Sequence, residues 1–107
     1  MPSSAVVVLV TVPSEAVAEQ LVTTIVEERL AACGNIVPGL TSIYRWQEKV
    51  QSDAELLIVF KTTRATAPRM LARIEALHPY EVPEALVLPV EGGLAPYLAW
   101  VTANSNG

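Results

Sequence analysis

The chain has 107 residues, of which 51% are hydrophobic and 17% are charged, and its formal net charge is −4. This composition excludes a disordered chain and fits a single domain over residues 1–107, with a core at about residues 5–103. The seven basic residues are scattered along the sequence. A nucleic-acid-binding protein concentrates positive charge in a stripe or patch, so we expect no nucleic-acid partner.

The cysteine content and the apolar runs indicate in which cellular compartment the protein is expected. Cys33 is the only cysteine, so it cannot form an internal disulfide bond, and a reducing compartment is expected. The apolar run at residues 5–12 has no basic residue before it and no small-residue cleavage site after it, which favours a buried strand over a signal peptide. No apolar run approaches membrane-spanning length. We therefore expect a cytoplasmic protein without a membrane partner.

Hydrophobic periodicity predicts four strands and three helices. Ser14 is suited to cap the first helix, and Gly34 is expected to end it in the left-handed conformation. Pro79 ends the second helix. In chain order we expect a strand at 5–12, a helix from 15 to about 32, a strand at 35–50 kinked at 38–39, a turn at 51–53, a strand at 56–60, a helix at 66–77, a strand at 85–90 and a helix at 94–103.

The order β-α-β-β-α-β, followed by a terminal helix, predicts an α+β fold of the ferredoxin-like split βαβ type. In this fold two helices cover one face of a four-stranded antiparallel sheet, and the crossovers are right-handed. The fold hosts many unrelated functions, so it does not indicate an activity.

The second predicted strand is unusually long. Residues 35–50 would extend on the order of 50 Å at about 3.3 Å per residue, whereas strands usually span roughly 17–20 Å. Either this segment breaks into two strands or it reaches beyond its own domain. Its outer half carries Tyr44 and Trp46 on one face and Arg45 on the other. A protruding ribbon with large aromatic residues is unstable alone in water, so we predict a subunit interface at these three residues.

Three residues are candidate metal ligands: Cys33, His78 and Glu81. Copper favours sulfur, and a histidine beside carboxylates could complete a site. Each of the first two has a structural alternative, which we favour: Cys33 as a small buried residue, and His78 as a helix-terminal residue that bonds to the backbone. The repeated His or Cys spacing of a strong metal site is missing.

The loop at residues 78–84 is a second candidate site. Two prolines confine it, and Tyr80, Glu81 and Glu84 project from it. Together with Lys61, at the end of the preceding strand, these residues could line a ligand cleft that accepts a small anionic ligand, or Lys61 could pair with a loop carboxylate. No Ser-His-Asp arrangement or phosphate-binding loop is present, so we do not expect an enzyme.

Six segments carry a family resemblance: Glu27–Cys33, Asn35–Gly39, Ser42–Trp46, Lys61–Thr63, His78–Glu84 and Tyr97–Trp100. In this order they resemble the CutA divalent-cation-tolerance family, and the agreement extends over essentially the whole chain. The resemblance implies a ferredoxin-like protomer, a homotrimer built from long β-ribbons, and a link to divalent-metal tolerance, copper above all. It also implies an architecture like that of the trimeric PII signalling proteins, which bind small ligands between subunits.

The leading hypothesis is a non-enzymatic cytoplasmic homotrimer that takes part in the response to divalent metals and binds copper directly, with no cofactor required. One alternative is a PII-like sensor that binds a small ligand in a cleft between subunits. Another is a structural trimer that docks a partner protein, with an indirect effect on metal tolerance.

Overall fold

The computed structural model describes residues 3–107 and has the predicted element order. All strand pairs are antiparallel, in the sheet order β2-β3-β1-β4, so the predicted ferredoxin-like α+β fold is confirmed. Within these residues, no helix is long and apolar enough to cross a membrane. The elements are β1 (Ala5–Val12), α1 (Glu15–Glu27), β2 (Cys33–Trp46), β3 (Lys49–Thr63), α2 (Ala67–Leu77), β4 (Ala85–Pro89) and α3 (Ala95–Ala103).

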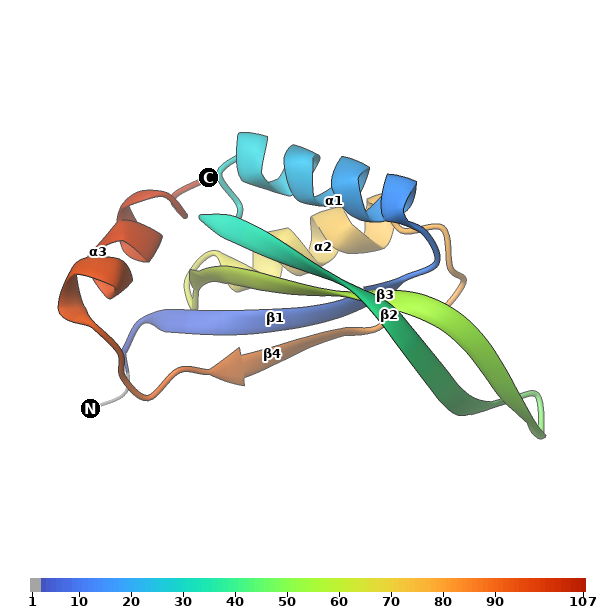
Figure 1. Cartoon of the computed structure of the whole chain (residues 1–107). Coiled ribbons are helices and arrows are strands. Elements are labelled where there is room, and N and C mark those ends of the chain that lie inside the picture. Colours follow the sequence, from blue (N-terminus) through green and yellow to red (C-terminus); the bar gives the residue numbers. More distant parts are fainter. Residues whose placement is uncertain (1–2) are drawn as a thin grey trace.

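The core lies between the sheet and the two longer helices, which pack on the same face (Figure 1). Alternate residues of β1 point into this layer and are fully buried, as the period of a strand requires. Helix α3 lies at one end of the sheet and packs against β1 and β3. The main core residues are Val6, Val8, Val10 and Val12 of β1, Ala18, Leu21 and Ile25 of α1, Ile58 and Phe60 of β3, and Met70 and Ile74 of α2.

The opposite face of the sheet is apolar as well. Val7 and Leu9 of β1 point to this side, and the register places Leu88 and Leu86 of β4 beside them. Leu86 is 56% exposed. Contiguous exposed apolar surface of this kind marks interaction sites in soluble proteins.

Helix α1 is shorter than predicted. Ser14 caps it as expected, with Oγ accepting a hydrogen bond from the N–H of Val17 at 3.2 Å. The helix ends at Glu27 rather than near Ala32. Arg29, with φ 60°, adopts the left-handed conformation that was predicted for Gly34. The early ending frees the chain to join the sheet, where the N–H of Ala32 donates to the carbonyl of Lys61 at 2.8 Å.

Gly34 lies inside β2 and is needed there for space rather than for its backbone conformation. A Cβ atom at this position would lie 3.0 Å from side-chain atoms of both Phe60 and Val22. The missing side chain therefore lets helix α1 and the buried ring of Phe60 approach the strand closely.

Strands β2 and β3 form one long hairpin that projects beyond the rest of the sheet (Figure 1). The predicted kink is confirmed as a bulge between Val37 and Leu40, with Gly39 at φ 86°. The predicted turn at residues 51–53 is wrong, because the chain reverses at Gln47 and Glu48, both with positive φ. β3 consequently begins at Lys49, not at residue 56. Of the two alternatives for the long segment, a break into two strands is wrong, because β2 continues through the bulge as one strand.

Candidate functional site: a cleft between the hairpin and the loop at residues 78–84

His78 anchors the loop at residues 78–84 to the sheet. Its side chain is buried, with 7% of its surface exposed, and its Nε2 lies 2.8 Å from the carbonyl oxygen of Thr11. Its Nδ1 accepts a hydrogen bond from the backbone N–H of Tyr80 at 3.1 Å. Because Nδ1 accepts, Nε2 must carry the proton and donate to Thr11, which defines a neutral tautomer. Both nitrogens are therefore engaged, as in the structural role favoured above.

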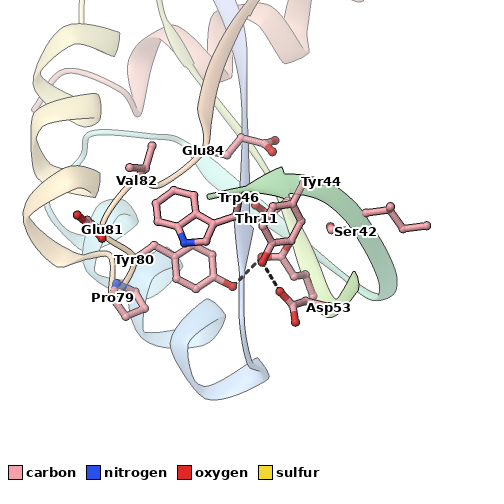
Figure 2. A pocket seen from close by; sticks show the side chains of 12 residues that line it. Thr11, Ser42, Tyr44, Trp46, Asp53, Pro79, Tyr80, Glu81, Val82 and Glu84 are labelled. Carbon is pink, nitrogen blue, oxygen red and sulfur yellow. Dashed lines mark hydrogen bonds between the residues drawn. The ribbon is translucent and has the colours of Figure 1, made fainter. Parts of the chain in front are cut away.

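Tyr80 joins the loop to the hairpin. Its hydroxyl group donates to Oε2 of Glu55, on β3, at 2.7 Å, and its ring lies 4.7 Å from that of His78. Burial, followed by the contact with Glu55, raises the pKa of Tyr80 well above its usual range. The phenol therefore remains a hydrogen-bond donor at neutral pH. Figure 2 shows the ring directed from the loop toward the hairpin.

The hairpin contributes the opposite wall. The register places Ser42, Tyr44 and Trp46 on one face of β2, beside Asp53 of β3. The hydroxyl group of Tyr44 donates to Asp53, and this hydrogen bond raises the pKa of Tyr44. The carboxylates of Asp53 and Glu55 are therefore each oriented by a phenol, one from the hairpin and one from the loop.

An open cleft with a volume of about 710 Å³ lies between these two walls. Figure 2 shows the side chains that line it. Pocket volumes of roughly 300–1,000 Å³ are typical of small-molecule sites. Among the described residues, none of those that line the cleft is lysine, arginine or histidine. The lining comprises the aromatic residues Tyr44, Trp46 and Tyr80, the acids Asp53, Glu55, Glu81 and Glu84, and Thr11, Ser42, Ile43, Pro79 and Val82.

Three of the four residues predicted for a ligand cleft meet here, but Lys61 does not. Tyr80, Glu81 and Glu84 line the cleft, whereas Lys61 donates to Oδ1 of Asn35. Lys61 pairs with Val7 of β1, four residues along the strand from the Thr11 that lines the cleft. That separation is about 13 Å. Without this lysine the cleft in one chain is acidic. The small anionic ligand was predicted for a cleft between subunits, and for such a cleft it stays a prediction.

The three predicted metal ligands are dispersed over the chain. Cys33 lies beside the hydroxyl group of Tyr97, with 3.7 Å between Sγ and Oη, while His78 is bonded to Thr11 and Glu81 lines the cleft. In residues 3–107, no three His, Cys, Asp or Glu side chains are grouped as metal ligands. A site of three such ligands would therefore need donors from more than one chain.

Asp53 and Glu55 were not predicted as site residues. They fell in or beside a segment taken for a turn. One signal could have identified them: Asp53 and Glu55 are two residues apart in the sequence, and so are Ser42, Tyr44 and Trp46. Period-2 alternation on two neighbouring segments is typical of one shared face of a hairpin.

The chain was compared with protein families and with proteins of known structure. The family model described as CutA1 divalent ion tolerance protein matches residues 6–104. The chain belongs to this family. It is 57% identical over 100 residues to the divalent-cation tolerance protein CutA of Thermus thermophilus, covering 94% of this chain and 97% of that protein. It is also 45% identical to the protein CutA of Mus musculus, covering 94% of this chain but only 57% of the mouse protein.

Solved CutA structures have the same fold. The Cut A1 protein of Thermus thermophilus aligns with a TM-score of 0.93 at 55% identity, over 95% of this chain and 99% of that one. CutA of Xylella fastidiosa aligns with a TM-score of 0.95 at 36% identity, over 97% and 100% of the two chains. The resemblance identified from short segments is thereby confirmed along the sequence and in three dimensions.

Proposed function

We propose that this protein takes part in cellular tolerance of divalent cations, as a non-enzymatic cytoplasmic homotrimer joined through the β2–β3 hairpin. Membership of the CutA1 family supports the link to divalent cations. The observation that carries the proposal of assembly is the hairpin itself, which leaves the sheet and exposes apolar residues on both faces.

The face of the hairpin opposite to Tyr44 and Trp46 strengthens this argument. Ile43 is 71% exposed and Val50 is 67% exposed, and the register places Arg45 directly opposite Val50. Two large aliphatic side chains in water on a two-stranded ribbon are unfavourable at about 25 cal/mol per Å² of apolar surface. A neighbouring subunit packed against the hairpin removes this cost, and Arg45 supplies a charge for pairing at the rim.

Sedimentation equilibrium tests the assembly. We expect about three times the chain mass of 11.5 kDa at micromolar concentration. Trp46→Asp is expected to weaken the assembly, because an unpaired charge in a desolvated interface costs several kcal/mol. Thr23→Asp is the matched control, since it adds the same charge on the exposed face of α1. A monomer mass for the parent protein would refute the trimer.

The physiological role is tested in cells. Deletion of the gene is expected to reduce growth at raised copper concentration, and the parent chain is expected to restore it. Trp46→Asp should restore growth less well than Thr23→Asp at equal protein level. Equal growth of deleted and parent cells over a range of copper, zinc and cobalt concentrations would contradict the proposed role.

A second candidate function is favoured by the cleft: a PII-like sensor that binds a small ligand. Copper titration in chelator-cleaned buffer separates direct metal binding from this alternative.

If Glu81 and Glu84 are metal ligands, replacing both with glutamine abolishes copper binding and leaves the trimer stable. If their role is structural, the same variant has a lower melting temperature, since a partner such as Lys61 of a neighbouring subunit is left unpaired. If neither property changes, this loop is not a metal site.

A further inference from the structure

We propose that the cleft between the hairpin and the loop binds a small organic cation, such as a protonated or quaternary amine. This inference rests on the second candidate function and names the chemical class of its ligand. Neither the sequence, which suggested an anionic ligand through Lys61, nor the family name indicates it.

The charge of the cleft selects a cation. Four carboxylates line it, and among the described residues that do so none is basic. Two of these acids are oriented by phenols, Asp53 by Tyr44 and Glu55 by Tyr80. A bound positive charge would offset the mutual repulsion of the acids.

Glu55 provides a separate observation. Only 8% of its surface is exposed, and it lines the cleft. Its Oε2 accepts a hydrogen bond from the hydroxyl group of Tyr80 at 2.7 Å. A carboxylate that is more than nine-tenths buried is costly unless a cation or further donors satisfy it. The negative charge of Glu55, largely removed from water and lining the cleft, is therefore the natural contact for an ammonium group.

The aromatic residues select an organic cation. Tyr44 and Trp46 come from the hairpin and Tyr80 comes from the loop, so rings stand on both walls of the same cleft (Figure 2). The face of an aromatic ring carries partial negative charge and attracts alkylammonium groups, with Trp the most effective. Rings and carboxylates around one space form the kind of cage that recognises methylated amines.

The size of the cleft argues against a bare metal ion. Calcium and magnesium need six or more oxygen atoms at about 2.0–2.6 Å. In the described part of the chain, no three acidic, histidine or cysteine side chains are grouped in that way. A volume of about 710 Å³ leaves room for a molecule rather than for an ion alone.

Titration calorimetry of the assembled protein with tetramethylammonium tests the proposal, with tert-butanol as an uncharged probe of similar size. We expect tetramethylammonium to bind at least about tenfold more tightly, because the alcohol lacks the charge that the rings and acids recognise. Glu55→Gln should weaken the binding of tetramethylammonium by about tenfold. Glu75→Gln, an exposed acid on α2, is the matched control and should have no effect.

Tryptophan fluorescence locates the binding site. Trp46 and Trp100 are the two tryptophans, so Trp100→Phe leaves Trp46 as the only reporter, and Trp46→Phe leaves only Trp100. Quenching by tetramethylammonium in the first variant and not in the second supports binding in the cleft.

The mass of the same sample, measured by sedimentation equilibrium, distinguishes a failure of the organic-cation inference from a failure of the proposed assembly. Equal binding of the two probes, or no binding to a sample whose mass is that of a trimer, overturns this inference and leaves the proposed assembly intact. No binding is also the result expected if a basic side chain of a neighbouring subunit fills the cleft. A monomer mass refutes the assembly instead, whatever the probes do.

Discussion

The hydrogen bond between Tyr80 and Glu55 connects the loop to the hairpin, so Tyr80→Phe tests how firmly the two walls of the cleft are joined. The two oxygen atoms are 2.7 Å apart, and Glu55 is 8% exposed. A hydrogen bond to a charged group contributes about 1.5–3 kcal/mol to stability. Tyr80 is 36% exposed, so water can replace part of the lost donor. We therefore expect the free energy of unfolding to fall by about 1.5 kcal/mol, the lower end of that range.

Urea unfolding at one fixed chain concentration measures this change, because the stability of an oligomer depends on concentration. Tyr97→Phe is the matched control. Its hydroxyl group contacts Sγ of Cys33 at 3.7 Å, a weak contact, so a loss below about 0.5 kcal/mol is expected. In a double-mutant cycle, Glu55→Gln should couple to Tyr80→Phe by about 1 kcal/mol. Equal losses in the two Phe variants, with no coupling, would show that the contact with Glu55 does not hold the loop.

Three further predictions use the same unfolding assay or calorimetry. Gly34→Ala should lower the free energy of unfolding by about 1–3 kcal/mol through overpacking, whereas Gly92→Ala, with nothing within 4 Å of the added atom, should have almost no effect. Cys33→Ser should change copper binding only modestly, since a single thiolate is not a site, and loss of a stoichiometric copper site would contradict this. Because burial and then its hydrogen bond raise the pKa of Tyr80, the folded chain keeps a proton that the unfolded chain releases above about pH 10. Stability should therefore fall as the pH rises beyond that value, and less so in Tyr80→Phe.

The element order was predictable because hydrophobic periodicity is a local property of the sequence. β1 was predicted with the bounds that the structure has, and Ser14 was recognised as a helix cap from its position alone. The reversal at Gln47 and Glu48 was not predictable in this way, since neither residue is a usual turn former. The polar residues at 51–53 gave the stronger turn signal. They are polar because this part of β3 extends beyond the helices and contacts water.

The cleft was only partly predictable, because its two walls come from distant parts of the sequence. The loop residues Tyr80, Glu81 and Glu84 were identified from the prolines that confine them. Their partners on the hairpin depend on the register of β3, and the turn error shortened that strand. The separation between Lys61 and the loop within one chain depends on the same register, so it could not be judged from the sequence.

If the proposed trimer forms, ligand binding in the cleft and assembly are linked. One wall is rigid, because His78 bonds to Thr11 of β1 through Nε2 and accepts a hydrogen bond from the N–H of Tyr80 within the loop. The other wall is the projecting half of a two-stranded ribbon, and such a ribbon is marginally stable by itself. If neighbouring subunits hold the hairpin in place, they also hold Tyr44 and Trp46 in position to meet a ligand. Thermodynamic coupling is reciprocal: if assembly favours ligand binding, ligand binding favours assembly. A ligand that bridges the two walls therefore stabilises the assembled state relative to the separate chains. Residues that the sequence suggested for the interface thereby acquire a second role, as one side of a binding site whose other side is the loop.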